Sequence, residues 1–206
     1  MATRTYLDWN ATAPLRPEAR EAMIAAMEPV GNPSSVHAEG RAATAIKERA
    51  RAQIAKAFGA EASDIIFTSG ATEAAALAMA GERWAGAEIE HDCVDVWTDT
   101  KLPVSPTGLV TISNAQTSVL QAANSETGIL QTLPEGIALC DAVQVAGKRP
   151  FAFEWSGAQR AMISAHKFGG PKGIGALIVQ KGTEVTALLK GGGQEQGRRS
   201  GTEDLL

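Results

Sequence analysis

The chain has 206 residues, of which 44% are hydrophobic and 20% are charged, with a formal net charge of −4 at pH 7. This length and composition are those of one globular domain with a sizeable core. An acidic balance without a basic run argues against nucleic acid as a partner, and no apolar run is long enough to span a membrane.

The termini and the cysteines bear on the cellular compartment. The first six residues lack the apolar core of a signal peptide. Cys93 and Cys140 have neither a metal-ligand spacing nor the pattern of a disulfide framework. We therefore expect a cytoplasmic protein without a metal site.

Two helices are expected in the first sixty residues. An extended piece at 6–14 leads to a helix that starts at Pro17, with an acidic residue in its first turn. Residues 40–58 predict a stronger amphipathic helix, which Gly59 caps. The polar loop between them, residues 31–37, is interpreted as a connector, with a substrate-side loop as the alternative.

A short buried strand at 64–68 runs into a loop of small residues and a helix. Small residues let the backbone approach an anion, and the start of a helix offers free N–H groups. Thr72 adds a hydroxyl group. The segment therefore predicts a phosphate site. The alternative is an ordinary capped helix, in which Glu73 is simply a favourable acidic residue in the first turn.

Residues 81–110 give weaker signals. His91 could stack on a flat ring, although a lone histidine is more often structural. Cys93 has no candidate base in the sequence, so we do not expect it to be a nucleophile. Residues 103–108 predict a loop.

Two further strands end in polar side chains. The run 118–123 ends before Asn124, and the run 137–140 ends before Asp141. An acid at a strand end could pair with a protonated pyridine nitrogen, as pyridoxal phosphate requires in order to act as an electron sink. The alternative for Asp141 is a helix N-cap.

The strongest chemical signal is the loop 164–175, between the apolar runs 161–163 and 176–179. Its four glycines and one proline argue against a helix. A lysine fixed beside a hydroxyl group and an imidazole suits a Schiff base to a phosphate-bearing aldehyde cofactor, and Ser164, His166 and Lys167 offer that set. The alternative is a glycine-rich turn with a solvated lysine. The later segment 188–202, glycine-rich and cationic, is interpreted as a mobile functional loop or a frayed tail.

Taken together, these motifs resemble the cysteine desulfurases of the NifS/IscS group, within the class V aminotransferase-like enzymes that use pyridoxal phosphate. The motifs occur in that family's order. The segments that carry the resemblance are residues 6–14, 31–37, 67–73, 124–128, 141–144, 164–167 and 191–202.

The resemblance implies the type I fold of pyridoxal-phosphate enzymes, an α/β fold with a doubly wound, mostly parallel sheet and flanking helices. It implies that residues 1–206 form the cofactor-binding large domain, with residues 1–16 as an N-terminal arm, and that the C-terminal small domain is absent. The family's nucleophilic cysteine and carboxylate-binding arginine lie in that later part. We therefore expect that the chain alone delivers no persulfide.

The resemblance also implies residue roles. Lys167 would form the Schiff base, and His91 would stack on the ring and serve in proton transfer. Thr202 would reach the phosphate of a partner subunit, which implies a homodimer. The other implied cofactor contacts are Asp141 at the pyridine nitrogen, Gln144 at the ring oxygen, Asn124 beside the ring and the substrate carboxylate, and Ala71, Thr72, Ser164 and His166 at the phosphate.

The implied reaction converts L-cysteine to L-alanine and passes sulfur on as a persulfide for iron–sulfur cluster assembly. The implied acceptor is an iron–sulfur scaffold or a sulfur-carrier protein. Two alternatives remain open. One is another class V aminotransferase or a selenocysteine lyase-like enzyme that needs no cysteine nucleophile. The other is a non-catalytic dimeric remnant.

Overall fold

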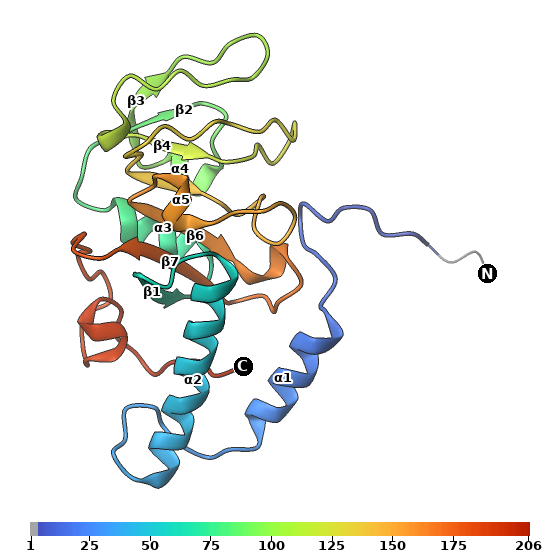
Figure 1. The fold of residues 1–206 in the computed structure, drawn as a ribbon, viewed down its shortest axis with the longest axis vertical. Helices are drawn as coiled ribbons and strands as arrows, with labels where there is room; N and C mark the ends of the chain where they lie inside the picture. Colours follow the sequence, from blue (N-terminus) through green and yellow to red (C-terminus); the bar gives the residue numbers. More distant parts are fainter. Residues whose placement is uncertain (1–3) are drawn as a thin grey trace.

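The computed structural model describes residues 4–206 and arranges them as strands and helices in layers (Figure 1). The strands are β1 (Ser63–Thr68), β2 (Trp84–Ala87), β3 (Thr98–Leu102), β4 (Val119–Gln121), β5 (Leu139–Asp141), β6 (Arg160–Ser164) and β7 (Gly175–Gln180). The α-helices are α1 (Pro17–Met27), α2 (Ala38–Ala57), α3 (Ala71–Met79), α4 (Asp92–Asp95) and α5 (Phe153–Ser156). Short 3-10 turns are η1 (Ala115–Thr117), η2 (Ala165–Lys167) and η3 (Gln194–Gly197).

The central sheet has the strand order β1-β7-β6-β5-β4. β4, β5 and β6 pair in parallel, whereas β7 is antiparallel to both β6 and β1. β2 and β3 form a second, parallel pair, and a bridge between Ala85 and Ser118 places β2 beside β4. The expectation of a mostly parallel sheet is confirmed. Because β1, β4, β5 and β6 run in the same direction, their carboxyl ends meet at one edge, where ligands bind in open α/β sheets.

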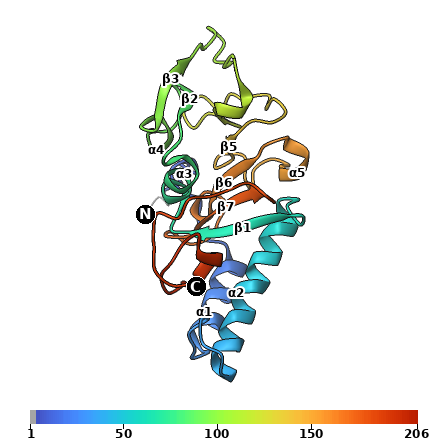
Figure 2. The same ribbon diagram turned by 90° about the vertical axis from the view of Figure 1, so that its left-hand side faces the viewer.

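Both faces of the sheet are covered, as expected for a doubly wound fold. In β6, Ala161 and Ile163 belong to the core beneath α2 and α5, whereas Met162 belongs to the core beneath α3. This alternation follows from the period of two along a strand. Figure 2 shows α3 and α5 on opposite sides of the sheet.

Several connections are shorter than a doubly wound fold usually has. The crossover from β4 to β5, residues 122–138, contains no helix, and α4 and α5 have only four residues each. Parallel strands are usually joined through a longer helix. Helical cover therefore comes mainly from α2 and α3.

Some sequence-based boundaries need correction. The second helix begins at Ala38, two residues earlier than expected, because His37 accepts a hydrogen bond from the Gly40 amide and caps it. The strands expected at 118–123 and 137–140 are found at 119–121 and 139–141. The glycine-rich loop after β6 contains the short turn η2, so its glycines exclude an α-helix but not a 3-10 turn.

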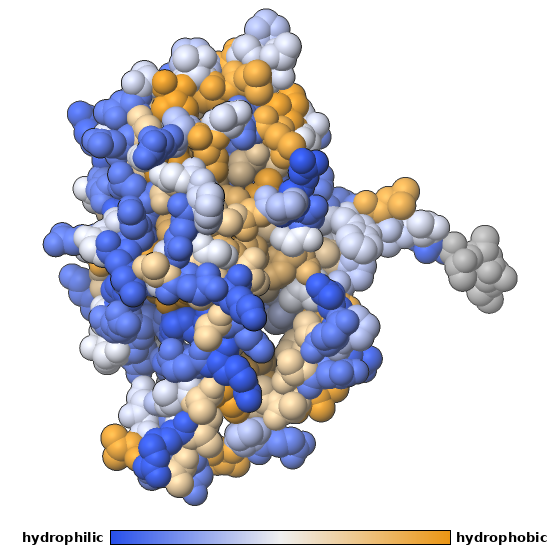
Figure 3. Space-filling model, in the orientation of Figure 1, coloured by the Kyte–Doolittle hydropathy of each residue, from blue (hydrophilic) through white to orange (hydrophobic). Residues whose placement is uncertain are grey.

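The apolar face expected on the second helix lies beside a groove rather than wholly in the core. Only Gly40 and Ala43 of α2 are buried, while Ile46, Ala50 and Ile54 line a groove of about 1390 Å³. Figure 3 shows apolar side chains around the hollow next to α1. No helix within residues 4–206 combines the length and the apolar character needed to cross a membrane.

Candidate active site

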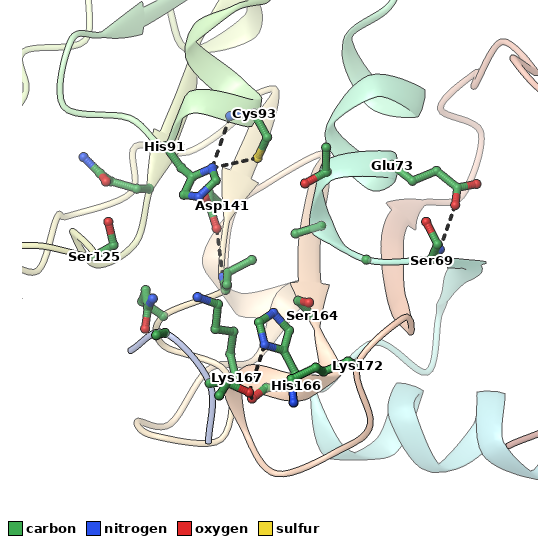
Figure 4. A pocket seen from close by; sticks show the side chains of 18 of the residues that line it. Ser69, Glu73, His91, Cys93, Ser125, Asp141, Ser164, His166, Lys167 and Lys172 are labelled. Atoms are coloured by element: carbon green, nitrogen blue, oxygen red, sulfur yellow. Dashed lines mark hydrogen bonds between the residues drawn. The ribbon is translucent and has the colours of Figure 1, made fainter. Parts of the chain in front are cut away.

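A cavity of about 500 Å³ opens at the carboxyl edge of the sheet (Figure 4). Side chains from the ends of β4, β5 and β6 form part of its wall, together with the loop before α3 and the arm around Thr12. The predicted site residues that line it are Ala71, Thr72, His91, Asp141, Gln144, Ser164, His166 and Lys167. Residues that are as many as 96 positions apart in the sequence thus meet in one place because their strands end at the same edge.

One wall of the cavity is a backbone cradle at the start of α3. Gly70, the N-cap, has φ +154°, and no side chain caps the helix there. A Cβ atom on Gly70 would find only Ser164 Oγ nearby, at 3.9 Å. A Cβ atom on Gly175 of β7 would lie 2.6 Å from the Gly70 Cα, so close packing here requires glycine. The free N–H groups of the first turn therefore face a space suited to an anion.

The lysine predicted to bind the cofactor lies at the opposite wall, directly after β6. Lys167 is in η2, and its Nζ donates a hydrogen bond to the Asn10 carbonyl oxygen at 2.6 Å. His166 Nδ1 lies 3.2 Å from Thr12 Oγ1. Burial, together with the charges of Lys167, Lys172 and Lys148, lowers the pKa of His166. The N-terminal arm therefore contacts both functional residues of this turn.

Asp141 forms the buried acidic group of the site. Its side chain accepts a hydrogen bond from the Val143 amide at 2.9 Å, and no α-helix begins at this residue, so the N-cap alternative is wrong. Burial raises the pKa of Asp141 to about 6, although the hydrogen bond from Val143 and the charges of His91 and Lys167 act to lower it. A cationic group bound next to Asp141 would favour its ionised form.

His91 lies across the cavity from Lys167, with Asp141 between them in the view of Figure 4. His91 Nδ1 accepts a hydrogen bond from the Cys93 amide at 3.1 Å and caps α4. A neutral imidazole that accepts at Nδ1 carries its proton on Nε2. The adjacent Cys93 thiol has a pKa raised to about 11, mainly by burial and then by Asp141. Cys93 is therefore a neutral thiol near pH 7, in line with the expectation that it is no nucleophile.

Three predicted site residues differ from the others in their contacts or their position. Asn124 is buried beside the cavity rather than in its lining, and its Oδ1 accepts hydrogen bonds from Glu126 and Thr127. Gln144 lines the cavity, but its Nε2 donates to the Asn10 carbonyl oxygen at 3.2 Å. Thr202 lies outside this cavity and lines a separate one.

The segment that carries Thr202 is anchored, so the frayed-tail alternative is wrong. Glu195 is buried and binds Arg51 through both carboxylate oxygens, at 2.7 and 2.9 Å. Arg199 Nε donates to Glu73 at 2.8 Å. Burial alone would raise the pKa of Glu73, but hydrogen bonds from Arg199 and the Ser69 amide hold it below its usual value.

Sequence reasoning missed a buried polar group behind the cavity. Glu90 Oε1 accepts a hydrogen bond from the backbone N–H of Gln121 at 3.2 Å. The side-chain oxygen of Gln121, Oε1, accepts one from Asn124 Nδ2 at 3.2 Å. Burial, and then the charge of Asp141, raises the pKa of Glu90 to about 8. In the sequence, Glu90 directly precedes His91 and resembles the family's acid–histidine pattern, and Gln121 lies within the strand expected at 118–123, but neither position signals a buried polar group. Within residues 4–206, no cluster of three or more His, Cys, Asp or Glu side chains could hold a metal ion.

Because the pKa of Glu90 is raised, we expect the free energy of unfolding to decrease as the pH rises. The folded chain keeps the Glu90 proton up to about pH 8, whereas the unfolded chain releases it near 4.5. Stability therefore falls as the pH rises through this window, because the folded state binds more protons. Glu90→Gln removes this contribution, so its free energy of unfolding should fall less steeply with pH, by up to about 1.4 kcal/mol per pH unit.

Urea unfolding at several pH values between about 5 and 8 measures this difference. Glu88→Gln is the matched control, because Glu88 is exposed. Parallel pH profiles for Glu90→Gln and the parent would contradict the prediction and show that Glu90 is ionised in the folded chain.

The profile of the class V aminotransferase family matches residues 5–99 and 100–202. The chain therefore belongs to the class V aminotransferase family, whose members include pyridoxal-phosphate enzymes.

Within this family, the chain is similar to cysteine desulfurases. It is 37% identical over 241 residues to cysteine desulfurase IscS of Dictyoglomus turgidum, covering 100% of this chain and 61% of that protein. The solved structure of a NifS-like protein matches with a TM-score of 0.89 and 33% identity, over 98% of this chain and 66% of the other. The structure of SspA in complex with cysteine matches with a TM-score of 0.87 and 28% identity, over 98% of this chain and 69% of the other.

These matches confirm the resemblance found in the sequence, and the chain is cysteine desulfurase-like along its length. They also confirm the fold class. The chain spans about three fifths of the length of the curated relatives that it matches.

Proposed function

We propose that this chain binds pyridoxal phosphate through Lys167 and takes part in a desulfurase-type reaction on L-cysteine. The observation that carries the proposal is the convergence of three features on one cavity. Lys167 Nζ, the buried Asp141 carboxyl group and the uncapped start of α3 all border it. These are the groups that a flat heterocycle with an aldehyde, a basic nitrogen and a phosphate requires.

The residues present fit this cofactor. A phosphate would accept hydrogen bonds from the first-turn amides of α3 at Ala71 and Thr72, with the Ser164 hydroxyl and the His166 imidazole as further donors. Gly70 supports this fit, because it is an uncapped N-cap and any other residue there would place a Cβ atom toward Ser164. An anion at that position would also raise the pKa of His166 and favour its charged form.

The cofactor, when bound, supplies an electron sink for the reacting carbon atom. Asp141 would be ionised and would keep a proton on the ring nitrogen. Lys167 would attach to the aldehyde through Nζ and would later hold or move a proton at that same atom. His91 would lie against the ring, with its Nε2 proton available for transfer.

The relatives support the proposed substrate, and the proposed sulfur acceptor comes from the family resemblance. Curated relatives such as that of Dictyoglomus turgidum are named cysteine desulfurases, and a structural relative has been solved in complex with cysteine. We propose L-cysteine as the substrate and an iron–sulfur scaffold or a sulfur-carrier protein as the acceptor. We further propose that residues 4–206 act as the cofactor-binding unit and that the sulfur-accepting thiol is neither Cys93 nor Cys140. Burial raises the pKa of both thiols, so neither is a thiolate near neutral pH.

We also propose a homodimer in which Thr202 contacts the phosphate of the partner subunit. Thr202 is exposed and lies outside the cavity of its own chain, so it is available to a second copy. The proposed compartment is the cytoplasm, where the two free cysteines would stay reduced.

The proposal is tested by trapping the cofactor. The purified chain is mixed with pyridoxal phosphate, the visible absorption is recorded, and borohydride is added to reduce the link between Lys167 and the aldehyde to a stable amine. Peptide mass spectrometry should place the modification on the peptide that contains Lys167. Modification spread over several exposed lysines such as Lys190, without a visible band, would refute the proposal and favour a non-catalytic dimeric protein.

A further inference from the structure

Glu73, in the first turn of α3, borders the proposed cofactor cavity with a negative charge. Although burial acts to raise its pKa, hydrogen bonds from Arg199 and the Ser69 amide hold that pKa below its usual value, so Glu73 is ionised near neutral pH. A phosphate bound to the amides of Ala71 and Thr72 would lie within one helical turn of this carboxylate. Binding would therefore bring two negative charges together, which is unfavourable unless a cation neutralises one of them.

Glu73 has a structural reason to occupy this position. Its Oε2 accepts a hydrogen bond from the Ser69 amide at 2.7 Å, so the carboxylate bends back over the start of the helix (Figure 4). Ser69 precedes the N-cap, and the N-cap residue Gly70 offers no side-chain acceptor. The first-turn amides therefore stay free for a ligand. A cation that neutralises Glu73 would remove the conflict with a phosphate at those amides.

That cation is Arg199, which is 126 positions later in the sequence. Its Nε donates to Glu73 Oε1 at 2.8 Å, and its Nη2 donates to Oε2 at 3.4 Å. The two side chains are only 22% and 19% exposed, so water and salt screen the pair only in part. Arg199 is not among the residues that line the cofactor cavity, and it lines a neighbouring cavity together with Thr202. It therefore acts on the phosphate site through Glu73.

The residues on either side of Arg199 hold it in place. Ser200 is buried, and its hydroxyl group donates to the Gly192 carbonyl oxygen at 2.7 Å. Arg198 donates to Asp64 in β1 at 2.8 Å. Because the backbone around Arg199 is fixed, little further conformational entropy is lost when its side chain pairs with the carboxylate.

We propose that Arg199 is a positioning residue for cofactor binding, which neutralises and orients Glu73 so that the start of α3 binds a phosphate group instead of repelling it. This inference rests on the proposed function and concerns the phosphate end of the cofactor. The pair then sets the preference for the phosphorylated over the unphosphorylated form of the cofactor. This role lies within one subunit and is separate from the contact that we propose for Thr202 in a partner subunit.

The test compares the affinities of full-chain variants for pyridoxal phosphate and for pyridoxal, each titrated through the visible band that Lys167 produces. Arg199→Ala should weaken the binding of pyridoxal phosphate about tenfold, because an unpaired carboxylate then faces the anion, and should change the binding of pyridoxal less than about twofold. Adding Glu73→Gln should return the affinity for pyridoxal phosphate to within about threefold of the parent. The glutamine is neutral and can still accept from the Ser69 amide.

Arg198→Ala is the matched control. It removes the same charge from the adjacent position and breaks an ion pair of the same length, the 2.8 Å contact with Asp64. Arg198 lines a different cavity, which does not include Glu73. Its replacement should therefore affect both ligands equally, and the ratio of the two affinities should match that of the parent.

The outcomes separate this inference from the proposed function. If the parent gives no visible band, the proposed function falls, and protection from thermal unfolding by inorganic phosphate tests the inference without the aldehyde chemistry. Protection that is lost in Arg199→Ala and regained in the double variant with Glu73→Gln supports the inference. No protection of the parent overturns it.

If the parent gives the band, the ratio of the affinities decides. Equal losses for pyridoxal phosphate and pyridoxal in Arg199→Ala, or a loss that Glu73→Gln does not restore, would overturn the inference alone and make the pair a structural anchor. If Arg199→Ala does not fold, Glu73→Gln by itself decides. A neutral side chain should bind pyridoxal phosphate at least as tightly as the parent, and a weaker affinity would refute the inference.

Discussion

Replacing Lys167 with alanine should abolish the visible absorption band of the chain with pyridoxal phosphate. The reason is chemical, since only a primary amine can form the covalent link to the aldehyde, and Lys167 Nζ is the amine that the fold brings into the cavity after β6. The change should leave stability nearly intact. Lys167 is half-buried, and the hydrogen bond of its Nζ to Asn10 is the one that the substitution removes.

Two other lysines serve as controls for this experiment. Lys172 also lines the cavity but is exposed, so Lys172→Ala should keep the band. Lys148 lies near the site, and burial and the charge of Lys167 lower its pKa. A lower pKa favours the neutral amine that reacts with an aldehyde, so Lys148 is the lysine that could compete with Lys167 for the cofactor. A band that survives Lys167→Ala and disappears in Lys148→Ala would contradict the assignment.

Replacing Glu195 with alanine should lower the free energy of unfolding by about 3–5 kcal/mol, the range observed when one partner of a buried ion pair is removed. The Glu195 side chain is 1% exposed and accepts two hydrogen bonds from Arg51 and one, at 2.9 Å, from the Phe67 amide in β1. Without it, the Arg51 guanidinium, which is 20% exposed and lies 4.8 Å from the centre of the Phe67 ring, would keep only the half-exposed Glu48 as an ionic partner.

Denaturant unfolding measures this effect, and Gln196→Ala is the matched control. Gln196 is the neighbouring residue, is exposed, and also has a positive φ, 59° compared with 48° for Glu195. The control therefore reports the effect of truncation at a left-handed position without loss of a buried charge, and it should stay within about 1 kcal/mol of the parent. A loss below about 1 kcal/mol in Glu195→Ala would mean that the pair behaves as an exposed one.

The Glu195 contact also links stability to the proposed function. It fixes the segment 189–203 to β1 and α2, and this segment carries Thr202, which we propose to serve a partner subunit. Glu195→Ala should therefore also reduce dimer formation, even where the chain remains folded. The sequence indicated a loop here because of its glycines and charges, but it could not reveal that Glu195 is buried opposite Arg51, 144 positions away.

The sequence could predict those residues of the candidate site that are marked by the residues next to them in the chain. Gly70 and Thr72 follow a strand and begin a helix, Asp141 ends a strand, and Lys167 follows another. Each of these positions could be read from a few neighbouring residues, because apolar runs, glycines and helix starts are short-range patterns. The roles of Asn124 and Gln144 came from the resemblance. In the structure, Asn124 Oδ1 accepts hydrogen bonds from the chain just after it, and Gln144 Nε2 donates to the Asn10 carbonyl oxygen.

The sequence by itself determined the helices α1, α2 and α3, the strands β1, β4, β5, β6 and β7, the small-residue loop before α3, the lysine loop after β6, and the family that these motifs resemble in order. Only the tertiary structure decided which strands are neighbours, that β7 runs antiparallel to β6 and β1, and that Glu90 and Gln121 are buried beside the cavity. The physical reason is that propensity and periodicity act between residues close in the chain, whereas strand pairing, burial and the pKa of a buried acid depend on groups that meet only after the chain has folded.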